Sequence, residues 1–91
     1  MISISSYYGK SPSAENNAKC VIVNDVRFYF SYETLVGIET PDRLNVIQNQ
    51  WGPTTGKHLN AIDSGSEEAK ANRLTSEEFQ KVAQEFNMVL A

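Results

Sequence analysis

Hydrophobic and polar residues follow a period of two between residues 19 and 50, where β-branched and aromatic residues dominate. This period is typical of strands with two different faces. Asn24-Asp25 suits a tight hairpin, and the proline and aspartate of Thr40–Arg43 suit a type I turn. Because connections this short join antiparallel neighbours, the pattern predicts a four-stranded antiparallel meander over residues 19–50.

Within this meander, the stretch 26–32 indicates which face of the sheet is buried. Arg27, Tyr29 and Ser31 share one face, and the hydrophobic residues share the other. The hydrophobic face is expected to form the core; its residues are Val26, Phe28, Phe30 and Tyr32.

Residues 1–18 begin with a short alternating piece and continue through many turn-forming residues. We expect this segment to be an irregular N-terminal arm. Its two adjacent tyrosines, Tyr7 and Tyr8, either pack back on the body of the protein or contact a ligand.

The second half of the chain has a helical period. Residues 54–62 predict a short helix with a threonine as its N-cap and with Leu59 and Ile62 turned inward. Thr75–Glu78 forms a capping-box sequence, and the apolar residues after it follow helical spacing over residues 76–90. The predicted fold class is therefore α+β, a meander packed against C-terminal helices in a single domain of residues 1–91.

Composition and charge narrow the functional classes. Hydrophobic residues make up 41% of the 91, as in an ordinary folded domain, and the net charge of −3 disfavours broad nucleic-acid binding. A single cysteine, Cys20, forms no internal disulfide. Neither an export signal nor an apolar run long enough to span a bilayer is evident, so we expect a cytoplasmic protein that does not enter membranes.

The chemistry-bearing residues are sparse. One histidine and one cysteine cannot supply the ligands of a metal site, and no serine lies in a nucleophile motif. We therefore predict a protein without catalytic residues, metal or cofactor.

The richest polar segment lies between Trp51 and Asn60. Its Gly-Lys pair resembles a phosphate loop, but the glycine spacing is one residue short and His58 stands where magnesium binding needs serine or threonine. The segment is either an anion site at a helix N-terminus or a simple helix cap, and Trp51 is either a core residue or a binding anchor. The candidate binding residues are Tyr32, Trp51, Thr54, Thr55, Lys57, His58 and Asn60.

About two thirds of the chain resembles a family of small uncharacterised proteins from bacterial viruses, prophages and mobile elements. The matching residues are Phe30–Val36, Trp51, Thr54–Asp63, and Leu74 with Glu77, Glu78 and Phe79. Relatives in that family often carry Asn-Tyr-Gly before the first strand, where this chain has Asn16-Asn17-Ala18. The resemblance implies a viral source and an accessory role.

Three functional hypotheses follow. The first is a non-enzymatic protein that binds a host or defence-system protein and inhibits it, as an anti-CRISPR protein does. The second is a nucleic-acid or nucleotide-phosphate binder that uses Lys57, His58 and aromatic stacking. The third is a homo-oligomeric structural module that pairs through an edge strand.

Overall fold

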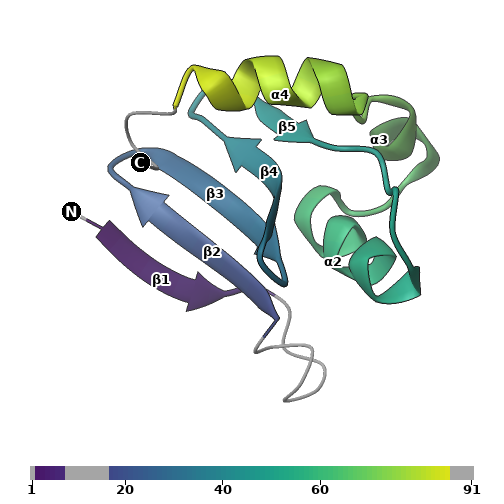
Figure 1. Ribbon diagram of the computed structural model, residues 1–91, viewed down its shortest axis with the longest axis horizontal. Coiled ribbons are helices and arrows are strands. Elements are labelled where there is room, and N and C mark those ends of the chain that lie inside the picture. The colour runs from purple at the N-terminus through teal and green to yellow at the C-terminus, as the bar shows by residue number, and fades with distance from the viewer. Residues whose placement is uncertain (1, 8–16, 87–91) are drawn as a thin grey trace.

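The computed structural model describes residues 2–7 and 17–86 and confirms the α+β class. A five-stranded antiparallel sheet has its strands in sequence order, and three helices follow it in the chain (Figure 1). The strands are β1 (Ile2–Ser6), β2 (Ala18–Val23), β3 (Val26–Ser31), β4 (Thr34–Glu39) and β5 (Leu44–Val46). The helices are α2 (Pro53–Asp63), α3 (Glu67–Ala71) and α4 (Ser76–Gln84).

The sheet has one strand more than the four predicted, and this additional strand is β1. The expectation of an irregular arm was therefore wrong for this part of residues 1–18. β1 pairs with β2 from Ile2 opposite Val23 to Ser6 opposite Lys19. Ile2 and Ile4 are exposed, so backbone pairing holds this strand and the hydrophobic pattern carried little information about it. Tyr7 packs on the body, because its hydroxyl donates to the Phe30 carbonyl at 2.8 Å. Residues 8–16, which include Tyr8, lie outside the described residues.

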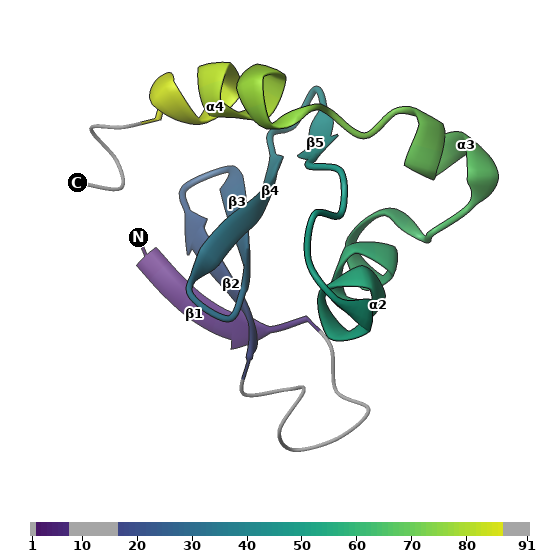
Figure 2. The same cartoon turned by 45° about the vertical axis from the view of Figure 1, so that its right-hand side comes forward.

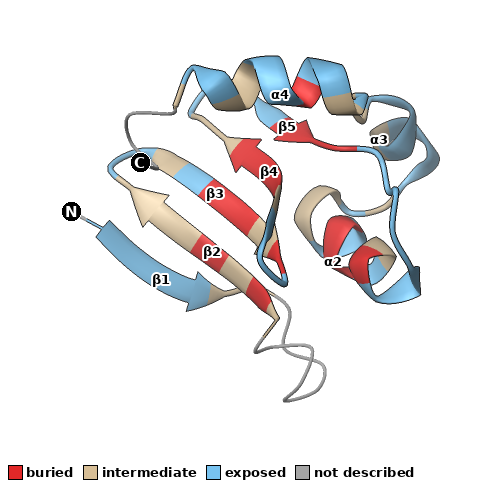
Figure 3. Ribbon diagram, in the orientation of Figure 1, coloured by how far each residue is buried: buried red, intermediate tan, exposed pale blue. Residues whose placement is uncertain are grey.

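Both faces of the sheet are covered, which corrects the expectation of a single core face. Phe28 and Ser31 point to opposite faces of β3, and both are buried. On the Ser31 face, α2 packs against the sheet, whereas the Phe28 ring meets Phe86, just beyond α4, at 5.6 Å between centroids. Figure 3 shows the buried positions of β3, β4 and β5 between these helices. Tyr32, expected in the core, is 50% exposed.

The helix ends are partly as predicted. The capping box of α4 is present, with the Glu78 N–H donating to Thr75 Oγ1 at 3.2 Å and the Thr75 N–H donating to the Glu78 carboxylate at 3.0 Å. The helix ends at Gln84, because Glu85 and Phe86 close it with tighter i−3 hydrogen bonds, so the predicted helix was wrong at these two residues. Residues 87–90 of the predicted helix lie outside the described part.

The start of α2 differs from the prediction as well. The helix begins at Pro53, and its N-cap is Gly52, which has no capping side chain. Proline is favoured at the first helical position because its φ is preset and its missing N–H would have no helical partner there. The predicted threonine cap was therefore wrong.

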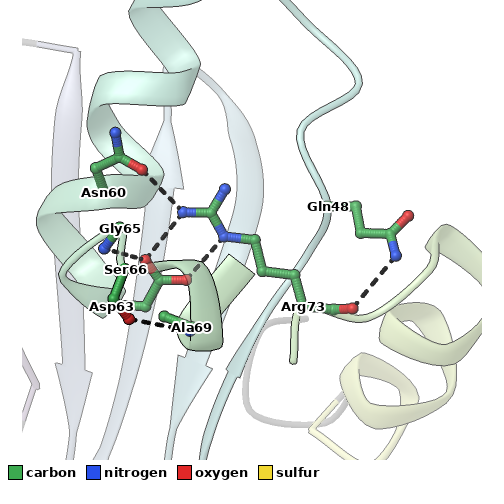
Figure 4. Close-up of polar contacts among 7 residues, drawn as sticks. All are labelled: Gln48, Asn60, Asp63, Gly65, Ser66, Ala69 and Arg73. Atoms are coloured by element: carbon green, nitrogen blue, oxygen red, sulfur yellow. Dashed lines mark hydrogen bonds and ion pairs between the residues drawn. The ribbon is translucent and has the colours of Figure 1, made fainter. Parts of the chain in front are cut away.

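An ion pair connects the end of α2 to the segment before α4. Arg73 donates to both carboxylate oxygens of Asp63, from Nε at 2.8 Å and from Nη2 at 2.9 Å, and Nη2 also donates to Asn60 Oδ1 at 3.0 Å (Figure 4). Next in the chain, Leu74 pairs in parallel with Ile47, just after β5. These contacts fix α2 relative to the sheet.

Candidate functional site

A pocket of about 180 Å³ opens between the β3–β4 turn and the start of α2. Its wall combines two aromatic side chains, three hydroxyl-bearing side chains and one valine. The lining residues are Ser31, Tyr32, Thr34, Val36, Trp51 and Thr55. Three of these, Tyr32, Trp51 and Thr55, are among the binding residues predicted from the sequence. We call this feature the Tyr32–Trp51 pocket.

Two exposed aromatic residues form part of the pocket wall. Tyr32 is 50% exposed and Trp51 is 44% exposed, and no other aromatic side chain of the described residues is so accessible. The turn between β3 and β4 holds Tyr32 at φ = 57°, a conformation that is unusual for a bulky residue. The backbone of Trp51 is fixed by a hydrogen bond, because its N–H donates to Asn49 Oδ1 at 2.9 Å. Local backbone structure thus presents both side chains at the surface.

Beneath the pocket, a chain of buried polar groups connects α2 to β3. Ser31 Oγ lies 2.7 Å from His58 Nδ1 and 3.0 Å from Thr55 Oγ1. His58 is fully buried, and its ring lies at 5.9 Å from the Tyr32 ring. A serine so close to an imidazole is the contact that activates nucleophiles, but Ser31 is 2% exposed and engaged on both sides. The arrangement positions α2 under the pocket.

Burial lowers the pKa of His58 below its usual range, since the charged imidazolium would lose its hydration. Below about pH 6.5 the unfolded chain therefore takes up more protons than the folded chain does. The free energy of unfolding should fall as pH drops from 7 through 6.5 toward the lowered pKa, by at most about 1.4 kcal/mol per pH unit.

Urea unfolding between pH 7.5 and 5.5 measures this dependence. The chain has one histidine, so the slope can be assigned by repeating the series with His58→Gln, in which it should disappear. A free energy that stays constant over this range in the wild type would mean that folding does not shift the pKa of the imidazole.

The other predicted binding residues do not line the pocket. Thr54 and Lys57 are exposed on α2, on the solvent side of the buried Thr55 and His58. Asn60 lies farther along α2, where its side chain accepts a hydrogen bond from Arg73. Sequence reasoning did not select Ser31, Thr34 and Val36, although all three lie in the matched stretch Phe30–Val36.

The comparisons with known proteins give one family. A family model described as "Family of unknown function (DUF8033)" matches residues 2–81. The chain belongs to this family. No curated protein matches this DUF8033 member. No solved structure matches it either.

A second pocket of about 200 Å³ in this DUF8033 member is lined by residues of β5, the end of α2, α3 and the segment after α3. Its charged lining residues, Asp63 and Arg73, already form the ion pair described above. Its remaining lining residues are Leu44, Val46, Ala69 and Asn72. Because Asp63 and Arg73 neutralise each other, this pocket has no unpaired charge to bind a ligand, and we regard the Tyr32–Trp51 pocket as the better candidate site.

Within residues 2–7 and 17–86, no group of three or more histidine, cysteine, aspartate or glutamate side chains is placed to hold a metal ion. Over the same residues, no helix has the length and apolar character needed to cross a membrane.

Proposed function

We propose that this DUF8033 member is a non-enzymatic protein-binding module whose partner inserts a side chain into the Tyr32–Trp51 pocket. The exposure of two large aromatic residues beside one pocket is the observation that carries the proposal. Tryptophan and tyrosine are the residues most often responsible for binding energy at protein interfaces. Each combines a large apolar surface with a polar group at its edge.

The size of the pocket favours a protein side chain over a free small molecule. Pockets for small molecules usually enclose about 300–1,000 Å³, whereas this one encloses about 180 Å³. One aliphatic or aromatic side chain of a partner would fill it. The exposed rings of Tyr32 and Trp51 supply apolar contacts at the pocket wall, and the exposed Thr34 supplies a polar one.

The charge distribution favours a protein over a nucleic acid. Neither lysine nor arginine occurs among the six residues that line the pocket. Tyr32 and Trp51 could stack on bases, but affinity for nucleic acids depends mainly on cations that contact phosphates. Lys57 on α2 is the exposed cation nearest in sequence to this site, and the chain as a whole carries a charge of −3.

The resemblance to small proteins of bacterial viruses supports a bacterial host protein as the partner, for example a component of a defence system that this chain inhibits. In that role the protein needs a stable surface and no reactive group, which agrees with the buried and doubly engaged Ser31.

The experiment compares two binding variants with one control. Because Tyr32 has a positive φ, Tyr32→Asn removes the ring and keeps a residue that tolerates the turn. Trp51→Ala removes the second ring. Leu44→Ala changes an exposed hydrophobic residue at the other pocket and is the matched control.

The tagged chain is used to capture proteins from bacterial lysate with and without nuclease treatment, and the protein captured after treatment is identified, purified and titrated. Removing an interface anchor typically lowers affinity by at least 2 kcal/mol, or about 30-fold. We expect that loss for Trp51→Ala, a smaller one for Tyr32→Asn, and unchanged affinity for Leu44→Ala. Equal affinity of all three variants would contradict the proposal, and capture that disappears with nuclease would support the nucleic-acid alternative.

A further inference from the structure

The two edges of the sheet differ in how well they are covered. At one edge, the short strand β5 is followed by Ile47, which pairs with Leu74; the Leu74 N–H donates to the Val46 carbonyl, and the Gln48 N–H donates to the Leu74 carbonyl. At the other edge, β1 pairs with β2 on one side and with no strand of the described residues on its outer side (Figures 1 and 2). β1 is therefore the open edge of the sheet.

The hydrogen-bond pattern shows which backbone groups of β1 point outward. The Tyr7 N–H donates to the Ala18 carbonyl at 3.2 Å, so this pair faces inward across the β1–β2 ladder. Inward and outward pairs alternate along an antiparallel strand. Ser5 and Ser3 therefore also bond to β2, and the N–H and C=O groups of Ile2 and Ile4 point away from the sheet.

β1 lacks the features that usually prevent edge strands from pairing. Proteins protect such edges with charged residues, prolines or bulges. β1 has the sequence Ile-Ser-Ile-Ser-Ser, without a charge or a proline, and its register with β2 is continuous from Ile2 to Ser6. Ile2 is 68% exposed and Ile4 is 69% exposed, and both lie on the same face of the strand.

We infer that β1 is the interface of a homodimer, in which the β1 strands of two copies pair antiparallel across a two-fold axis at Ile4. Each Ile4 then donates its outward N–H to the carbonyl of the other Ile4, and one sheet continues through both copies. The two Ile4 side chains lie side by side on one face, where cross-strand pairs of β-branched residues stabilise a sheet.

The absence of charge on β1 makes a second copy the best-matched occupant. Two uncharged strands meet without like-charge repulsion, although each chain carries a net charge of −3. The carboxylates of Glu67 and Glu68 belong to α3, which lies at the far side of the molecule from β1 in both ribbon views (Figures 1 and 2). Pairing through β1 keeps the α3 helices of the two copies apart, which reduces their mutual repulsion.

Sedimentation of the full chain over a range of concentrations tests the dimer. The wild type should reach twice the mass of one chain. Ile4→Lys places two like charges beside each other in the dimer, and Ile4→Pro removes the outward N–H while leaving the bonds to β2 in place. Each variant should raise the dissociation constant at least tenfold, with circular dichroism unchanged. Leu44→Lys, which alters the opposite edge strand, should remain dimeric.

A crosslinking variant tests the register. Paired residues at this position have Cα atoms about 5.5 Å apart, within the range that a disulfide spans. Ile4→Cys should therefore give a covalent dimer on oxidation, whereas Leu44→Cys and the wild type, whose Cys20 is buried, should not. A wild type that stays monomeric at every concentration would overturn the inference, as would a dimer that both Ile4→Lys and Ile4→Pro leave intact. The Tyr32–Trp51 pocket and β1 share no residue. A failed dimer test therefore leaves the proposed partner binding untouched, and a failed binding test leaves the dimer untouched.

Discussion

Replacing Arg73 with alanine is expected to lower the free energy of unfolding by about 3–5 kcal/mol, the range for removing one partner of a buried ion pair. The side chains of Arg73 and Asp63 are each 7% exposed, so the remaining carboxylate would be buried without its cation. It would keep the backbone hydrogen bonds, among them that from the Gly65 N–H at 3.0 Å, but no cation. A small domain is stable by only about 5–15 kcal/mol, so this variant should be severely weakened.

Urea unfolding measures the loss, and two controls define its cause. Lys70→Ala removes an exposed cation in α3 and should change the free energy by less than about 0.5 kcal/mol. The double variant Asp63→Leu/Arg73→Met should lose less than Arg73→Ala alone, because no unpaired charge remains. If Arg73→Ala loses less than about 1 kcal/mol, the pair behaves as a solvent-exposed one.

The dependence of stability on acid pH is an independent test of the Asp63–Arg73 ion pair. Burial by itself raises the pKa of Asp63, but the hydrogen bonds from Arg73 and Gly65 outweigh it, and the pKa lies below its ordinary value. The pair therefore contributes stability above that ordinary value, and the contribution disappears as pH falls through the lowered pKa.

Local sequence signals were sufficient for most of the secondary structure. The Asn24-Asp25 hairpin forms, with Asn24 at φ = 56°, because asparagine tolerates this conformation. The capping box at Thr75 predicted the start of α4 because both of its hydrogen bonds lie within one turn. β1 was missed although Ile2 and Ile4 alternate with serines, because the alternating piece is short and the many turn-forming residues after it favoured an irregular arm.

The burial of the site residues depends on contacts between distant segments and could not be read from periodicity. Tyr29 is buried on the face that was not expected to form the core, because the Tyr7 ring packs against it at 5.2 Å between centroids and its hydroxyl donates to the Glu39 carboxylate at 2.9 Å. Likewise Asn60 appeared beside Lys57 and His58 as a binding residue, but Arg73, thirteen positions later, binds its side chain. The pocket combines a turn residue and a helix residue that sequence spacing alone does not bring together.

Lys57 and His58 are adjacent in the chain, but substituting them should have very different consequences. His58→Ala is expected to lower the free energy of unfolding by about 2–5 kcal/mol, the range for truncating a large buried side chain. The imidazole is fully buried and lies 2.7 Å from Ser31 Oγ, so the variant leaves both a cavity and a hydroxyl with one partner fewer. Lys57→Ala should change stability by less than about 0.5 kcal/mol, since this side chain is exposed.

Thermal and urea unfolding of the two variants measure this difference, and His58→Gln is the conservative comparison because it retains polar atoms near Ser31. We expect His58→Gln to lose less stability than His58→Ala. Because His58 holds α2 to β3 under the Tyr32–Trp51 pocket, His58→Ala should weaken partner binding by disturbing the pocket, whereas Lys57→Ala should leave it unchanged. A His58→Ala variant as stable as the wild type would show that the imidazole does not anchor α2. A strong binding defect in the stable Lys57→Ala variant would instead indicate a cation-dependent interface at the start of α2.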